Sequence, residues 1–322
     1  MRRTVGTIAG VVLGLVLLVG AFAKAVDPRA FVEQIELEGL DIALSAEVVM
    51  YLALALEAGL GLLLVSGVRR LWVLVSAAAL VAFFLALTGR AYWDVTFGIA
   101  EAGRGCGCFG NLVARTPAQA FWQDLLMMGP AVALAFVGRG RARGIPSRRI
   151  FASATGVLAT LLLAWRAPEL PLDDLVTRLR PGVAIAELCA GAADDPYRVC
   201  LDALAPELDA GNHLVVIAAL DDALFESAVE ELNRYAEAGI GPRLWVLSSD
   251  PEPVQHAFFW RWAPSFEVRE APEELLRPMV RSLPRSFRVS DGRVSRTFGE
   301  IPPLDEIAER ARTESDLEAG GR

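Results

Sequence analysis

Histidine and cysteine are scarce in this sequence, and it has no excess of basic residues. The chain of 322 residues holds two histidines and four cysteines, and its formal net charge is -8. Because nucleic-acid phosphates are bound by clustered lysine and arginine, this acidic balance argues against a nucleic-acid partner. Since metal sites usually take about four ligands, the shortage of histidine argues against a metal centre.

Apolar residues are abundant and unevenly spread. They make up 54% of the chain, against roughly 45–50% in soluble domains. Residues 1–166 are dominated by Leu, Ala, Val and Gly and are predicted to form a membrane domain. Residues 167–181 hold three prolines among charged residues and are predicted as a linker. A soluble domain is expected over 182–312, followed by a disordered, polar tail at 313–322.

Five apolar runs approach the roughly 20 residues that a helix needs to cross a bilayer. They are residues 5–23, 43–66, 71–88, 118–137 and 150–165. Lipid offers no partners for backbone polar groups, so these runs are predicted to be helices. For the first run the alternative is a cleaved signal peptide, because Arg2 and Arg3 precede it and Ala21-Phe22-Ala23 resembles a cleavage site.

Arginines in the short loops predict the orientation. Arg2 and Arg3, Arg69 and Arg70, and five arginines between 139 and 149 all fall on one side if every run crosses. That side is expected to be cytoplasmic. The loops at 24–42 and 89–117 are then external, and so is the C-terminal domain. We therefore expect a multi-pass protein of a bacterial cytoplasmic (inner) membrane, surrounded by lipid, with a periplasmic or extracellular C-terminal domain.

The C-terminal half alternates between strand and helix patterns. Strands are predicted at residues 214–220, 244–248, 285–289 and 293–297. Helices are predicted at residues 223–238, 253–263, 274–281 and 303–312. Ser290-Asp291-Gly292 joins the last two strands as a hairpin turn.

Cys106 and Cys108 flank a glycine in the external loop before the fourth run. Gly107 permits the bend that would bring the two sulfurs together. A ring this small is expected to be strained, which is typical of a labile or catalytic disulfide. The alternatives are half a metal site, or two thiols that only brace a Gly-rich loop.

Cys189 and Cys200 form the second cysteine pair, also on the external side. In an oxidising compartment they are expected to form a structural disulfide. The alternative is a relay that exchanges electrons with Cys106 and Cys108.

Glu57 lies near the middle of the second run, where an unpaired charge would cost roughly 2.5–3.5 kcal/mol. It is therefore expected to be protonated, paired or directed into the bundle, in either a packing or a functional role. No basic residue lies at matching depth in the sequence. Lys24, at the outer end of the first run, is expected to pair with Glu47 at the outer start of the second.

Aromatic residues gather at the outer boundary of the membrane domain. They are Tyr92, Trp93, Phe109, Phe121 and Trp122. An interfacial belt is the first interpretation. The alternative is a quinone pocket beside Cys106 and Cys108, and its polar contacts would be Arg90, Gln123 and Asp124.

The membrane half resembles the MauE branch of the DoxX-like membrane proteins. The resemblance rests on three stretches: Ala23-Lys24-Ala25-Val26-Asp27-Pro28 with Phe31, Glu57 with Gly61 and Gly67, and Cys106-Gly107-Cys108-Phe109-Gly110-Asn111. It implies a helical membrane bundle and a redox role for Cys106 and Cys108. Family members are associated with disulfide formation or maturation of a periplasmic methylamine dehydrogenase subunit, although the substrate does not carry over.

The C-terminal half is similar to thioredoxin-like α/β domains. The similarity rests on the order of strands and helices and on Leu283-Pro284 before the hairpin, which makes Pro284 the candidate cis-proline. The family's dithiol would follow the first strand, but Asp221-Asp222-Ala223-Leu224-Phe225 has no cysteine. The domain would then be a docking module, or would use Cys189 and Cys200 in a non-standard way.

Three functions agree with these residues. The first is a membrane thiol–disulfide oxidoreductase that takes electrons from an extracytoplasmic protein thiol client and passes them on, with a quinone as the candidate cofactor. The second is a non-catalytic assembly factor whose outer domain docks a client. The third is a subunit of a quinol-linked respiratory oxidoreductase.

Overall fold

The computed structural model describes residues 2–98, 116–137, 146–190, 198–309 and 312, with side chains from residue 4 onward. The chain divides into two compact units, Met1–Leu172 and Asp173–Arg322. Each unit has buried hydrophobic clusters of its own.

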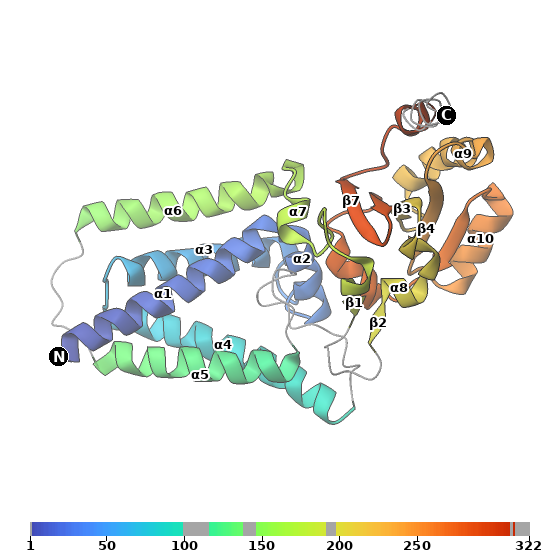
Figure 1. Ribbon diagram of the computed structural model, residues 1–322. Coiled ribbons are helices and arrows are strands. Elements are labelled where there is room, and N and C mark those ends of the chain that lie inside the picture. Colours follow the sequence, from blue (N-terminus) through green and yellow to red (C-terminus); the bar gives the residue numbers. More distant parts are fainter. Residues whose placement is uncertain (1, 99–115, 138–145, 191–197, 310–311, 313–322) are drawn as a thin grey trace. The chain divides into compact units, whose positions relative to one another are not determined.

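In the described part of the first unit, five helices are long and apolar enough to cross a bilayer. They are α1 (Arg2–Val26), α3 (Ala46–Val65), α4 (Leu71–Thr96), α5 (Pro117–Val137) and α6 (Ser147–Arg166). These helices run side by side (Figure 1). The predicted helical bundle is therefore confirmed, with α4 eight residues longer than its apolar run because Arg90 and Asp94 continue the helix as an i,i+4 pair.

Large apolar side chains cover the outside of these helices. Exposed examples are Ile8, Val19, Leu52, Leu126 and Phe151. Contiguous apolar surface of this kind is unfavourable in water and marks a membrane contact. The exposed faces of the bundle are therefore its lipid-facing faces.

The region after α1 is helical, although the sequence predicted only an external loop there. Helix α2 (Pro28–Leu37) has proline at its first position and Asp27 as its N-cap. Asp27 Oδ1 accepts a hydrogen bond from the backbone N–H of Ala30 at 3.4 Å. Because a residue before proline avoids the helical conformation, Asp27 ends α1 and begins α2.

Helices α1 and α3 touch through glycine. A Cβ added to Gly14 would lie 2.7 Å from the carbonyl oxygen of Gly61, and a Cβ on Gly61 would lie 2.9 Å from that of Gly14. Gly10 lies beside Arg69, and Gly61 also meets Leu18, so the two helices are antiparallel. Small residues at such crossings allow the close approach on which helix packing in membranes depends.

The second unit is built on a five-stranded sheet with strand order β5-β4-β3-β6-β7. The strands are β3 (Asn212–Ile217), β4 (Arg243–Ser248), β5 (Glu267–Glu270), β6 (Arg285–Ser290) and β7 (Arg293–Phe298). β3 pairs in parallel with β4 and β4 with β5, whereas β6 is antiparallel to β3 and β7. The mixed sheet and its final hairpin agree with the predicted α/β region, but strand β5 was not predicted.

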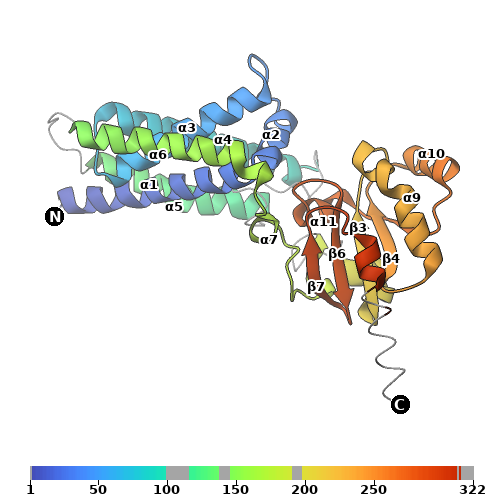
Figure 2. The same ribbon diagram turned by 90° about the horizontal axis from the view of Figure 1, so that it is seen from above.

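Helices cover one face of this sheet. They are α9 (Ala223–Ala238) and α10 (Glu252–Trp262), shown beside β3 and β4 in Figure 2, together with helical residues 304–309. Leu214 and Val216 point to this face, whereas Val215 and Ile217 point to the other. The alternation follows from the two-residue period of a strand.

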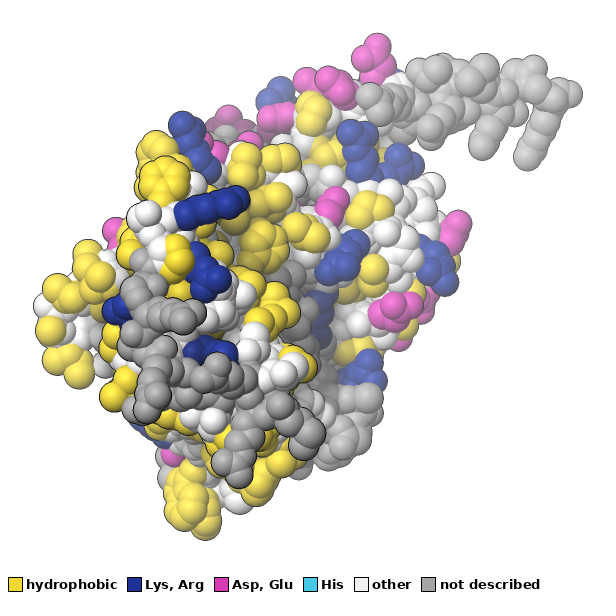
Figure 3. Space-filling model, turned by 90° about the vertical axis from the view of Figure 1, so that its left-hand side faces the viewer, with side chains coloured by type: hydrophobic (Ala, Val, Ile, Leu, Met, Phe, Trp, Pro, Cys, Tyr) yellow, Lys and Arg dark blue, Asp and Glu magenta, His cyan; other side chains and the backbone are white. Residues whose placement is uncertain are grey.

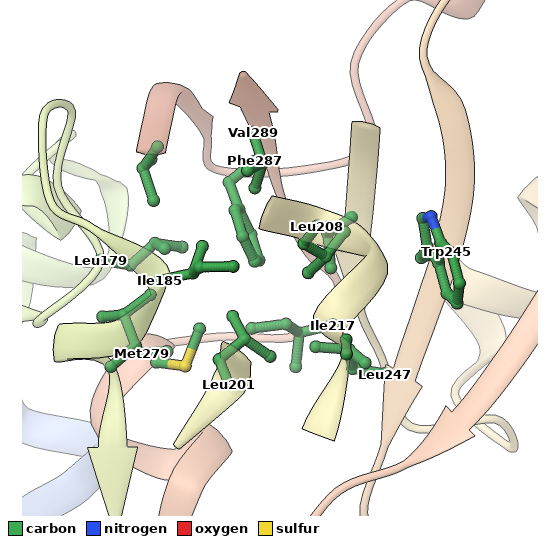
Figure 4. Packing of buried hydrophobic residues seen from close by; sticks show 14 of the residues in the cluster. Leu179, Ile185, Leu201, Leu208, Ile217, Trp245, Leu247, Met279, Phe287 and Val289 are labelled. Carbon is green, nitrogen blue, oxygen red and sulfur yellow. The ribbon is translucent and has the colours of Figure 1, made fainter. Parts of the chain in front are cut away.

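The N-terminal segment of the unit covers the opposite face. Its short elements are α7 (Asp173–Val176), η3 (Ile185–Glu187), β1 (Cys189–Ala190), β2 (Val199–Cys200), α8 (Leu201–Leu204) and η4 (Pro206–Asp209). Figure 4 shows Ile185, Leu201 and Leu208 of this segment directed toward Phe287 and Ile217 of the sheet. Turns α11 (Glu273–Leu276) and η5 (Arg277–Met279) stand where one helix over 274–281 was predicted, because Pro278 interrupts the backbone bonding.

Residues predicted as a linker contribute to the second unit. Leu179 is part of the buried cluster, and Thr177 is buried beside it. Arg285, fully buried on β6, donates hydrogen bonds to Thr177 Oγ1 and Asp174 Oδ1 at 2.7 and 3.3 Å. Of the predicted linker, only η2 (Ala167–Glu169) and residues 170–172 belong to the first unit. Asp174, Thr177 and Leu179 therefore supply hydrogen-bond acceptors to the two terminal nitrogens of the Arg285 guanidinium, whose pKa is lowered by burial.

Candidate functional site

A buried ion pair joins α1 to α3 inside the membrane unit. Lys24 Nζ contacts Glu57 Oε1, and the two residues are only 2% and 1% exposed. The expected pair of Lys24 with Glu47 is wrong, since Glu47 lies exposed in the first turn of α3. An intramembrane ion pair of this kind is costly to bury and often marks a functional site.

Side-chain direction explains why residues at different depths meet. Side chains in a helix lean toward the helix N-terminus. Lys24, near the C-terminal end of α1, is directed back toward the middle of α1. Glu57, in the middle of α3, is directed toward the N-terminal end of α3. Because α1 and α3 are antiparallel, the two side chains approach each other. The ammonium group also lies over the ring of Phe31 at 5.2 Å and that of Phe84 at 4.7 Å. These ring faces add cation–π attraction to the ion pair.

Further polar side chains are buried in the same unit. Asp27, Thr88 and Asp124 are each 3% exposed or less. Thr88 Oγ1 donates to the carbonyl of Phe84 at 3.0 Å, so it lies one turn from the ring that covers Lys24. Glu57 Oε2 is buried and has no hydrogen-bond partner among the described residues. The bundle thus carries an acceptor that a proton or a hydrogen-bond donor could satisfy.

The residues predicted as quinone contacts do not share one environment. Asp124 is buried, whereas Arg90, Trp93, Trp122 and Gln123 are exposed. The neighbouring aromatic residues form surface contacts: Tyr92 stacks on Phe121 at 5.9 Å, Trp122 meets the edge of Phe121 at 5.3 Å, and Trp93 packs on Phe97 at 4.2 Å. This arrangement favours the aromatic belt, and the quinone pocket stays a prediction.

Cys106 and Cys108 lie outside the described residues, and so do Phe109 and the predicted disordered tail at 313–322. Their predicted roles are therefore neither supported nor opposed by the geometry. No group of three or more His, Cys, Asp or Glu side chains with metal-binding geometry occurs in the part of the chain that the structure describes.

The second cysteine pair is joined. Cys189 and Cys200 form a disulfide across the antiparallel strands β1 and β2, in which the two residues are direct partners. Arg198 Nη2 lies 3.1 Å from Cys189 Sγ, and Arg178 Nη1 donates to the Cys189 carbonyl at 2.9 Å. Burial lowers the pKa of Arg178. Sequence reasoning missed both arginines, since nothing in their spacing from Cys189 indicates the contact.

At the carboxyl ends of β3 and β4, where a thioredoxin-like dithiol would lie, two aspartates accept hydrogen bonds from the backbone. Asp222 caps α9 by accepting from the backbone N–H groups of Leu224 and Phe225 at 2.7 and 3.2 Å. Asp250 accepts from the N–H of Leu220 at 2.6 Å and from Ser248 Oγ at 2.7 Å. These carboxylates organise the ends of β3 and β4. The Leu283–Pro284 peptide bond is cis, as the sequence predicted for Pro284.

Basic side chains mark one end of the membrane unit. Arg69 and Arg70 precede α4, and Arg148 and Arg149 lie in the first turn of α6. Figure 3 shows this end, with Lys and Arg side chains gathered among apolar ones. Clustered arginine next to short membrane loops is typical of the cytoplasmic side.

Taken together, the five apolar helices of the described residues and a following region of mixed sheet and helix define a multi-pass membrane protein with an α/β C-terminal unit. Residues 2–137 match the family model described as methylamine utilisation protein MauE. The match ends with α5, so α6 and the α/β unit lie beyond it. A comparison with curated proteins finds no match for the chain.

Proposed function

We propose that this protein is a membrane thiol–disulfide redox protein that supports disulfide formation or maturation of an extracytoplasmic partner, as in methylamine utilisation. The observation that carries the proposal is the MauE match over residues 2–137, because it contains Cys106-Gly107-Cys108. A dithiol on the client would reduce the Cys106–Cys108 disulfide and become a disulfide itself. The reduced cysteines would then pass two electrons and two protons to an oxidant, for which a quinone is the proposed class.

The compartment in the proposal has independent support. Disulfides persist mainly in oxidising compartments, and Cys189–Cys200 is such a bond in the second unit. The arginines at the start of α4 and of α6 indicate that this end of the membrane unit faces the cytosol. We therefore propose a bacterial inner-membrane location with the α/β unit in the periplasm.

The α/β unit is proposed to be thioredoxin-like and to dock the client. Its parallel β3-α9-β4 segment, antiparallel β6-β7 hairpin and cis-Pro284 support that fold. The N-cap Asp222 and the first turn of α9, which includes Glu226, contain no cysteine, so the usual dithiol is missing. A purely docking role, with Cys106 and Cys108 dispensable, is the second candidate function, and the missing dithiol is consistent with it.

Thiol trapping in intact cells tests the leading proposal. Wild-type Cys106 and Cys108 are expected to be oxidised, reachable by a membrane-impermeant thiol reagent after reduction, and required for maturation of the client. Cys108→Ser is expected to accumulate mixed disulfides with the client through Cys106. If the Cys106→Ser, Cys108→Ser double variant complements fully while deletion of residues 182–322 does not, the docking function replaces the redox function.

A further inference from the structure

The two sulfurs of the Cys189–Cys200 disulfide have different surroundings. Cys189 is 4% exposed, whereas Cys200 is partly exposed at the end of β2. The guanidinium of Arg198 lies 3.1 Å from the sulfur of Cys189. Cys200 is therefore the more exposed residue of the pair, and the positive charge lies beside the sulfur of Cys189.

This asymmetry has a chemical consequence. In thiol–disulfide exchange a thiolate attacks one sulfur, and the other sulfur leaves as a thiolate. A neighbouring cation stabilises a thiolate, and a better-stabilised leaving group departs faster. With Arg198 beside Cys189, attack at Cys200 puts the developing negative charge where it is best stabilised.

The backbone around the bond does not depend on the bond alone. Ala190 pairs with Val199 in the same two-stranded sheet, and the N–H of Leu201 donates to the carbonyl of Leu188 at 2.9 Å. Arg178 donates a hydrogen bond to the Cys189 carbonyl, and Leu188 and Leu201 are buried in the core. The strands are therefore expected to stay paired when the sulfurs separate, so that the bond can form again.

We propose that Cys189–Cys200 is an exchangeable disulfide with a fixed polarity: Cys200 is attacked by an external thiolate, and Cys189 leaves as a thiolate beside Arg198. The first exchange forms a mixed disulfide between the incoming sulfur and Cys200. A second thiol of the same client displaces Cys200, so the client gains a disulfide and the pair becomes a dithiol. Reoxidation needs another disulfide or a quinone. That the thiol belongs to a protein client rests on the proposed function above; the polarity does not.

Glutathione provides a direct test on the full chain in detergent. The Cys106→Ser, Cys108→Ser variant leaves Cys189 and Cys200 as its only cysteines. After brief exposure to reduced glutathione, mass spectrometry of peptides is expected to find the adduct on Cys200 and a free thiol on Cys189. If the double-serine variant fails to fold, the same peptides are measured in the wild-type chain. Failure of Cys106 and Cys108 to function in cells would leave this result unchanged.

Arg198 variants separate exchange chemistry from a structural role. Arg198→Ala is expected to slow adduct formation on the order of threefold to tenfold, because the leaving thiolate loses its cation. Arg198→Lys should restore much of the rate. Arg234→Ala, an exposed change of the same charge on α9 across the sheet, is the matched control. Equal adducts on both sulfurs, an unchanged rate in Arg198→Ala, or a reduction rate equal to that of global unfolding would identify a structural clip and overturn the proposal.

Discussion

At Lys24 and Glu57, two opposite charges lie where the bundle excludes solvent. Removing one partner leaves the other buried and uncompensated, a change that costs about 3–5 kcal/mol in protein interiors. Glu57→Gln and Lys24→Met are therefore each expected to lower thermal stability in detergent. The Lys24→Met, Glu57→Gln double variant should lose less than the sum of the two single variants.

Glu47→Gln is the control for that series, because Glu47 is exposed. Its expected change is within about 0.5 kcal/mol, as for ordinary surface substitutions. Additive losses in the Lys24–Glu57 double variant would show that the two charges are not coupled.

The contact of Glu207 with Arg269 predicts that the stability of the second unit depends on pH. Hydrogen bonds from Arg269 lower the pKa of Glu207 from 4.5 to about 2. Because the folded-state pKa is depressed, this contact stabilises the unit fully above about pH 4.5, and the stabilisation is lost as the pH falls toward about 2. Glu207→Gln should make thermal unfolding less sensitive to pH across that window.

The effect of Glu207 belongs to an exposed ion pair, so 0.5 M salt should weaken it. Glu230→Gln on the exposed side of α9 serves as the matched control. An identical pH profile in Glu207→Gln and wild-type protein would contradict the assignment.

At the scale of the helices, the close packing of α1 against α3 depends on the contact between Gly14 and Gly61. Gly61→Ala would place a methyl group 2.8 Å from Leu18 Cγ and 2.9 Å from the Gly14 carbonyl, so the helices must separate. Overpacking of this kind costs about 1–3 kcal/mol. We expect Gly61→Ala to lower the melting temperature and the yield of folded protein extracted from membranes.

A second glycine on α3 gives the matched control. Among the described residues, the Cβ of Gly59→Ala would meet Val157 Cγ2, at an ordinary contact distance of 3.5 Å. Both variants add the same methyl group to the same helix, so they share any change in helix propensity. Equal stability of the two variants would show that the α1–α3 contact does not limit packing.

For the whole molecule, the proposed orientation predicts the sidedness of labelling. A cysteine introduced at Ser147, beside Arg148, should react with an impermeant maleimide only after the inner membrane is opened. A cysteine at Glu230 in the α/β unit should react without that step. Both sites are exposed in the described chain, so a difference between them reports the compartment. The reverse pattern would reject the orientation and the periplasmic location together.

The apolar runs predicted the membrane helices closely because a bilayer leaves few solutions. About 20 apolar residues without backbone partners in lipid must form a helix. The strand runs around Leu214 and Leu244 were equally clear. Strand β5 was missed because Glu-Val-Arg-Glu has only one apolar residue, and its pairing with β4 supplies the stability that its composition lacks.

The candidate site was only partly predictable. The cysteine pairs stand out because cysteine is scarce, and cis-Pro284 was predicted from the resemblance to thioredoxin-like domains. The partner of Lys24 was mispredicted because depth along the sequence ignores the direction in which side chains lean. Arg198 and Arg178 could not be identified, since their role exists only when β1 and β2 lie side by side.

The sequence by itself determined which segments enter the bilayer and which alternate between strand and helix. Burial in lipid requires a long apolar run, and burial in a sheet or against it imposes a repeating pattern of apolar residues, so both can be read from the residues themselves. Only the tertiary structure decided which charges meet, which glycines touch and which sulfur lies beside a guanidinium. Those contacts join residues far apart in the chain, where spacing carries no information about distance and packing alone fixes the partners.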